Sequence, residues 1–143
     1  MTEPIRYLAL GRKAGLLEIG EENVGTAVRA GKGRLLMLAK DASDNAVARA
    51  RGFVYGKNTP IVSLPYTKEE ISDAVGKTGC SMAVFTDIGM ASSFADAMES
   101  LLPTEFGQTA LELREKKAKM AQRKAEAKAH ERNKKTGKRR TKQ

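Results

Sequence analysis

Two hydrophobic patterns alternate along the first 103 residues, and this alternation limits the folds that the chain can adopt. Segments with apolar residues three or four positions apart, the spacing of a helix face, are separated by short apolar runs typical of buried strands. Helices are expected at residues 5–15, 20–31, 43–56, 67–76 and 87–103, and strands at residues 16–19, 34–40, 60–65 and 81–86. Short connections between such elements favour a central sheet covered by helices on both faces. The sequence therefore predicts an α/β fold, a three-layer α/β/α sandwich with a four-stranded sheet.

Local signals support several of these boundaries. Ser43 precedes a helical pattern as an N-cap, and Thr67 with Glu70 has the spacing of a capping box. Gly76 is expected to end one helix, and Pro103 to end another.

Positive charge is concentrated at the end of the chain. Residues 114–143 contain 14 Lys or Arg and three acidic residues, whereas the first 113 residues contain 12 Lys or Arg and 14 acidic residues. The net charge of the whole chain is +9. From Leu111 onward the residues are strong helix formers, without an apolar stripe wide enough to dock on a core. We expect a domain at residues 1–103 and a solvated basic extension at residues 104–143 that is helical or disordered and frays from residue 136.

The composition argues against several classes of function. The only cysteine is Cys80 and the only histidine is His130, so neither a disulfide within the chain nor a catalytic histidine in the core is expected. GKTG at residues 76–79 lacks the earlier glycine of a phosphate loop and joins a helix to a strand, the reverse of that motif. We expect a non-catalytic cytoplasmic protein that is monomeric when free, with no metal and no membrane partner.

Acidic residues open the helix expected at residues 20–31. Glu21 and Glu22 complement the positive end of a helix dipole, which alone explains them, and Asn23 is then a surface residue. The alternative is a binding site: Gly20 lets another backbone approach, the helix amides can hold phosphate, and Asn and Glu can read base edges.

Three blocks of sequence support the binding-site alternative. GEENVGTAVRAGKGRLLMLAKDAS, PIVSLPYTKEEISDAVGK and MAVFTDIGMA, within residues 5–102, resemble the ribosomal protein L-seven-Ae / L-thirty-e superfamily, and most closely its bacterial Ylx-type members. The resemblance implies a three-layer sandwich without a cofactor. It also implies that the protein binds kink-turn RNA, a sharply bent internal loop with sheared G·A pairs, and that it associates with the ribosome.

The resemblance also assigns roles by position. Gly20 would admit the RNA backbone, and Glu21, Glu22 and Asn23 would contact the guanines. Thr26 stands where a lysine is usual. The remaining positions implied to contact the loop nucleotides, the backbone or an apolar part of the RNA are Val47, Lys68, Val75, Lys77 and Met82.

Two alternatives remain open. One is a protein-interaction module of the same fold, whose extension adds only nonspecific RNA affinity. The other is an enzyme that acts on nucleotides.

Overall fold

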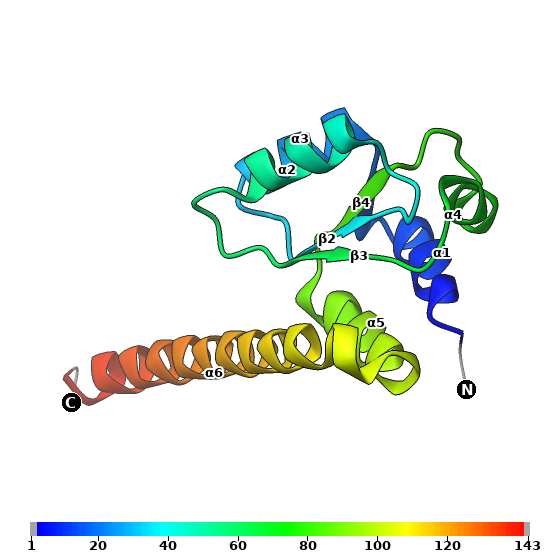
Figure 1. Cartoon of the computed structure of the whole chain (residues 1–143). Coiled ribbons are helices and arrows are strands. Elements are labelled where there is room, and N and C mark those ends of the chain that lie inside the picture. The colour runs from blue at the N-terminus through cyan, green and yellow to red at the C-terminus, as the bar shows by residue number, and fades with distance from the viewer. Residues whose placement is uncertain (1–2, 142–143) are drawn as a thin grey trace.

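The chain forms a sheet flanked by helices and continues into one long helix (Figure 1). The computed structural model describes residues 3–141, and side chains as far as residue 134. Every helix and strand expected in the first 103 residues is present, within a few residues of its predicted bounds. The elements in order are α1 (Ile5–Lys13), β1 (Leu17–Ile19), α2 (Glu21–Arg29), β2 (Leu35–Leu38), α3 (Asp44–Val54), β3 (Ile61–Ser63), α4 (Lys68–Val75), β4 (Met82–Phe85), α5 (Ile88–Leu101) and α6 (Pro103–Thr141).

The four strands are arranged in the order β1-β4-β2-β3. Strand β2 is parallel to β3, and β4 is antiparallel to both β1 and β2. Strands β1, β2 and β3 therefore run in one direction and finish at the same end of the sheet, beside the start of β4. We call this the carboxyl end of the sheet, and the opposite end the amino end.

Side chains that alternate along each strand separate the two faces of the sheet. Leu36 and Leu38 of β2 pack with α2 and α3, whereas Leu35 and Met37 pack with α1, α4 and α5. Helices thus cover both faces, and Figure 1 shows α2 and α3 on one side and α5 on the other. The predicted α/β/α sandwich is confirmed.

The first turns of α6 belong to this core. Phe106, Ala110 and Leu113, at most 1% exposed, lie in the same apolar cluster as residues of α1, α4 and α5. The prediction that the chain from Leu111 onward does not dock on the core is therefore wrong at Leu113. Phe106, Ala110 and Leu113 form a buried row with spacings of four and three residues. Only Leu113 of this row lies after residue 111, so the sequence from residue 111 onward shows no apolar stripe. The domain boundary expected at residue 103 coincides with the start of α6, while the buried side chains of α6 continue to Leu113.

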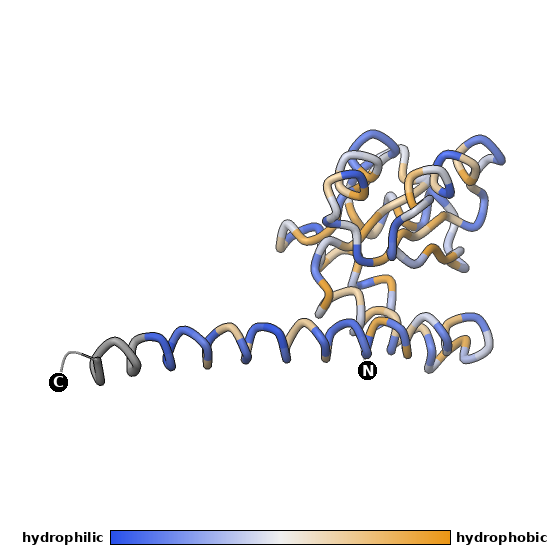
Figure 2. Tube along the Cα trace, turned by 90° about the vertical axis from the view of Figure 1, so that its left-hand side faces the viewer, coloured by the Kyte–Doolittle hydropathy of each residue, from blue (hydrophilic) through white to orange (hydrophobic). Residues whose placement is uncertain are grey.

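Beyond the core, α6 continues as a polar helix. Its described side chains from residue 121 to residue 134 are exposed, and Figure 2 shows mostly hydrophilic residues along this part. Of the two states expected for the extension, helical or disordered, the helical one is observed as far as Thr141. The fraying expected from residue 136 is not seen in this backbone, and residues 142–143 lie outside the described part. No helix within residues 3–141 is both long and apolar enough to cross a bilayer.

Candidate nucleic-acid interface

Three helices begin at the carboxyl end of the sheet. Helices α2, α3 and α4 follow β1, β2 and β3, and each therefore points its first amides toward this end. Hydrogen bonds tie the connecting loops together: the amide of Gly20 donates to the Met82 carbonyl at 3.2 Å, and the amide of Lys68 donates to Oδ1 of Asp41 at 2.8 Å. Unpaired amides at a helix N-terminus attract anions, so this end of the sheet favours negatively charged ligands.

The start of α2 differs from the other two. Ser43 caps α3 by accepting a hydrogen bond from the Ala46 amide at 3.1 Å, and Thr67 caps α4 in the predicted capping box with Glu70. At the N-cap of α2, Gly20 has φ +92° and ψ 153° and supplies no side-chain cap. This backbone conformation is essentially restricted to glycine. The first amides of α2 therefore have no side-chain acceptor from the N-cap residue.

Glu21 forms an ion pair with an arginine that was not predicted from the sequence. Nη1 of Arg49, on α3, lies 2.9 Å from Oε2 of Glu21. The Arg49 side chain is 65% exposed, so the pair borders solvent and adds little to stability. The sequence contained no signal for this pair, because the two residues are 28 positions apart and meet only when α2 and α3 pack together.

The next predicted residues of α2 are oriented by bonds within the chain. Nδ2 of Asn23 donates to the Ile19 carbonyl at 3.0 Å, and Oγ1 of Thr26 donates to the Glu22 carbonyl at 2.9 Å. Glu22, Asn23 and Thr26 are all exposed. Asn23 thus holds the turn between β1 and α2 and keeps its carbonyl oxygen as an acceptor.

A polar hollow of about 380 Å³ lies beside the start of α2. It brings together two of the predicted residues, Glu21 and Lys68. The other residues that line it come from the start of α3 and from the loop before β4 and were not predicted as site residues: Ser43, Asn45, Ala46, Arg49, Gly79 and Ser81. Hydroxyl, amide, carboxylate and cationic groups here suit a ligand that carries both phosphate and base edges.

Two of the residues predicted to contact RNA are buried in the core. Val75 is 7% exposed and Met82 is 1% exposed, and both pack into the apolar clusters beside the sheet. The pattern of its element points each of them into the core, so little of either side chain is accessible at the surface, and their apolar contact with RNA stays a prediction. Val47 is half-buried against the α2/α3 cluster, and Lys77 is exposed in the loop after α4.

Groups with shifted acidity lie away from this hollow. Burial raises the pKa of Tyr66, and nearby Glu3 and Glu70 raise it further. Hydrogen bonds to Glu99 and Asp96 raise the pKa of Arg114. Neither residue lines the hollow, and within residues 3–134 no group of three His, Cys, Asp or Glu side chains is placed to hold a metal ion. The polar and charged groups that line the hollow are suited to hydrogen bonding.

Comparisons with solved structures show the same fold. A protein of unknown function from Bacillus halodurans has a TM-score of 0.62 at 22% sequence identity, over 69% of this chain and 99% of that chain. A 15.5 kDa RNA-binding protein from Giardia lamblia has a TM-score of 0.54 at 17% identity, over 68% of this chain and 83% of that chain. No protein-family model matches the sequence, and no curated protein matches it.

Proposed function

We propose that this chain is a non-catalytic RNA-binding protein that recognises a kink-turn or a similarly bent RNA at the carboxyl end of its sheet. The observation that carries the proposal is the start of α2, where Gly20 leaves the first amides without a side-chain cap beside a polar hollow. The fold shared with the Giardia RNA-binding protein supports it. The sequence resemblance favours a cytoplasmic protein associated with the ribosome.

Each side chain has a defined task in this proposal. The amides of α2 donate hydrogen bonds to phosphate oxygens, and the exposed carboxylate of Glu22 accepts hydrogen bonds from a guanine edge. Arg49 and Lys68 border the hollow and offset the repulsion between Glu21 and the RNA backbone. Short-range hydrogen bonds of this kind depend on the shape of the RNA, which is the basis for discrimination.

The proposal is tested with the full chain and two RNAs of equal length. One contains tandem sheared G·A pairs beside an internal loop, and the other is the same duplex fully paired. We expect tighter binding to the bent RNA in fluorescence anisotropy titrations. Equal affinity for the two RNAs would refute bend recognition and favour the protein-interaction alternative.

A matched pair of variants locates the contact. Glu22→Ala and Glu105→Ala each remove an exposed acid from the first turn of a helix, α2 or α6. Both changes lose a similar helix-dipole contribution of about 0.3–1 kcal/mol to stability. Only Glu22→Ala is expected to reduce the preference for bent RNA, by about 1–3 kcal/mol. A reduction of similar size in both variants would mean that general charge, and not the start of α2, sets the preference.

A further inference from the structure

A second polar surface lies at the amino end of the sheet, where α6 passes the loops that lead into β2 and β3. A hollow of about 430 Å³ is formed there between these loops and α6. We call it the basic groove and define it by Arg34, Asn58, Thr59, Lys116, Lys119 and Arg123. Arg34 directly precedes β2, and Thr59 shortly precedes β3, so the groove lies at the opposite end of the sheet from the start of α2.

The wall that α6 contributes to the groove is held in place. Leu113 is fully buried, and Arg114 bonds to Asp96 at 2.7 Å and to Glu99 at 3.2 Å, both on α5. Nζ of Lys116 donates to the carbonyl of Asn58 and so joins α6 to the loop before β3. Lys116 is therefore held against the core, and Lys119 and Arg123 follow it within the next two turns of the same helix.

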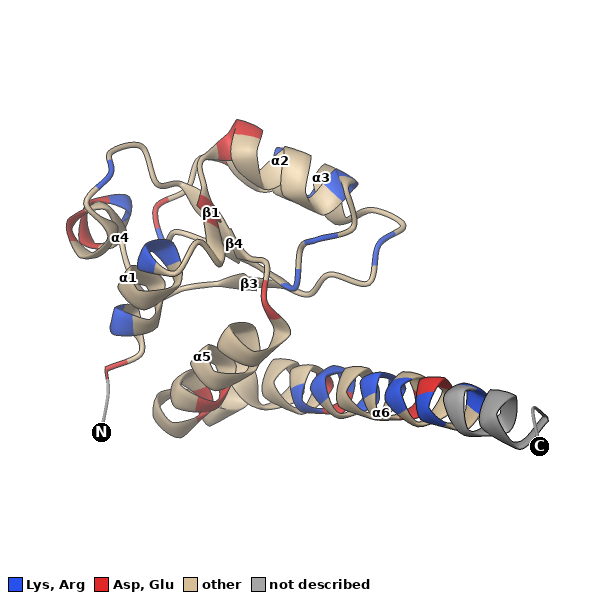
Figure 3. Cartoon of the chain, turned by 180° about the vertical axis from the view of Figure 1, so that it is seen from behind, with Lys and Arg blue, Asp and Glu red and all other residues tan. Residues whose placement is uncertain are grey.

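Charge in the groove has one sign. Arg34, Lys116, Lys119 and Arg123 line it, and no carboxylate is among its lining residues. Glu112 and Glu115 line an adjoining hollow with Lys57, and Lys116 and Lys119 lie on the border between the two hollows, so Arg34 and Arg123 are the groove cations that do not share a hollow with these acids. Figure 3 shows the basic residues that continue along α6.

The spacing of the three α6 cations suits a linear polyanion. Residues 116, 119 and 123 are three and four positions apart, so they share one face of the helix. They extend over about 10 Å at 1.5 Å per residue, which is roughly three nucleotides of a stacked strand. A strand of phosphates can therefore contact all three while Arg34 approaches from the opposite wall.

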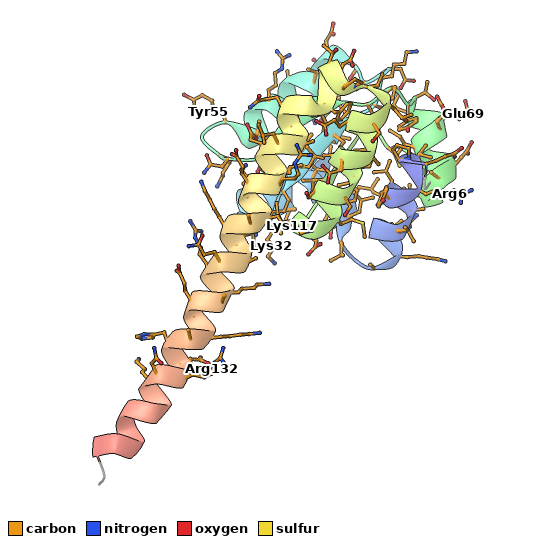
Figure 4. All side chains as sticks on the ribbon, turned by 90° about the horizontal axis from the view of Figure 1, so that it is seen from below. Arg6, Lys32, Tyr55, Glu69, Lys117 and Arg132 are labelled. Carbon is orange, nitrogen blue, oxygen red and sulfur yellow. The ribbon has the colours of Figure 1, made fainter. Side chains whose placement is uncertain are left out.

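An exposed aromatic side chain lies on the loop that borders the groove. Tyr55, three residues before Asn58, is 89% exposed and points away from the body of the molecule (Figure 4). Stacking of an exposed tyrosine ring on an unpaired base contributes favourable free energy to binding. A cationic groove combined with exposed aromatic rings is typical of proteins that bind single strands. An acidic peptide would use the cations but has no need of this ring.

We propose that the basic groove binds the phosphates of an unpaired RNA strand and that Tyr55 stacks on one of its bases. This site goes beyond the bent-RNA function and does not depend on it, because a strand without any G·A pairs is sufficient to occupy it. The groove therefore makes part of the basic extension a defined binding surface instead of a source of general charge.

The test uses the full chain and a fluorescent single-stranded RNA of ten nucleotides with no self-complementarity. Lys119→Gln/Arg123→Gln removes two groove cations, and Lys124→Gln/Lys128→Gln removes two from the exposed part of the same helix. We expect about a tenfold loss of affinity at low salt for the first and less than about threefold for the second. The first should also lower the slope of log affinity against log salt by about 1.4. Equal losses would overturn the proposal, since only net charge would then matter.

A variant in the core separates the groove from α6. Arg34→Gln should weaken binding of this strand by about threefold or more, whereas Arg6→Gln, an exposed arginine on α1, should leave it nearly unchanged. A loss confined to α6 variants would show that the core wall takes no part, and the proposal would fail.

The aromatic part of the proposal has its own measurement. Tyr55→Ala should lower the affinity for the strand about fivefold or more without changing the salt slope, and Tyr55→Phe should restore binding. An unchanged affinity would refute stacking. Stronger groove-dependent binding of a ten-residue glutamate peptide than of the RNA strand would instead assign the groove to an acidic protein.

The two functions fail separately. If the bent-RNA proposal is wrong, the groove variants still weaken binding of the unpaired strand. If the groove proposal is wrong, Glu22→Ala still changes the preference between bent and paired RNA. Measuring both RNAs with both sets of variants assigns each failure to its own site.

Discussion

Replacing Leu113 by alanine tests whether α6 is part of the folded core. Leu113 is fully buried with Phe106 and Ala110, in the cluster that also contains residues of α1, α4 and α5. Truncating a buried leucine costs about 2–5 kcal/mol, the sum of lost transfer free energy and the cavity left behind. A loss near 3 kcal/mol corresponds to a decrease in melting temperature of roughly 10 °C for a chain of this size.

The control is Leu111→Ala, on the same helix. Leu111 is 44% exposed, so its truncation should lower the free energy of unfolding by less than about 1 kcal/mol. Thermal and urea unfolding followed by circular dichroism measure both variants. Equal effects would mean that Leu113 is not packed against the core, and the fixed wall of the basic groove would lose its support.

Three further predictions concern the start of α2 and the end of α6. Gly20→Ala should cost about 1–3 kcal/mol of stability because φ is +92° although a Cβ would meet nothing within 4 Å, whereas Gly52→Ala, an exposed position inside α3, should stabilise the fold slightly in the same urea titrations. Thr26→Lys should tighten binding of bent RNA, most at low salt, more than Thr104→Lys does; equal effects would show that residue 26 does not face RNA. Deleting residues 124–143 should weaken binding of bent and paired RNA by similar factors and flatten the salt dependence; losing the preference itself would assign recognition to this segment.

The element order and the helix starts were predictable because their signals are local. Ser43 and Thr67 with Glu70 act as caps within four residues of sequence, and the structure has both caps as predicted. Gly76 also ends α4 as expected, with φ +71°. Signals of this kind need no knowledge of how distant segments pair.

The composition of the candidate site was less predictable because it depends on strand order. The helix starts meet at one end only because β1, β2 and β3 run in the same direction, and β4, the last strand in sequence, lies between β1 and β2. Arg49 reaches Glu21, and Gly79 and Ser81 reach the same hollow, through this arrangement. Val75 and Met82 were assigned to the site by position alone, and their burial in the core was not part of that assignment.

The distribution of charge explains how a basic protein can carry acid at its candidate recognition surface. Glu21 is paired with Arg49 and Glu22 is exposed, and Figure 3 shows acidic residues at the start of α2. The cations of the basic groove lie at the other end of the sheet, and exposed charges farther apart than about 8–10 Å are largely screened at physiological salt. Electrostatic attraction to RNA can therefore come from α6 without reducing the selectivity of the short-range contacts at α2. A strongly basic surface at α2 would bind the backbone of any RNA. Because the charge there is nearly balanced, the shape of the RNA determines which RNA is bound.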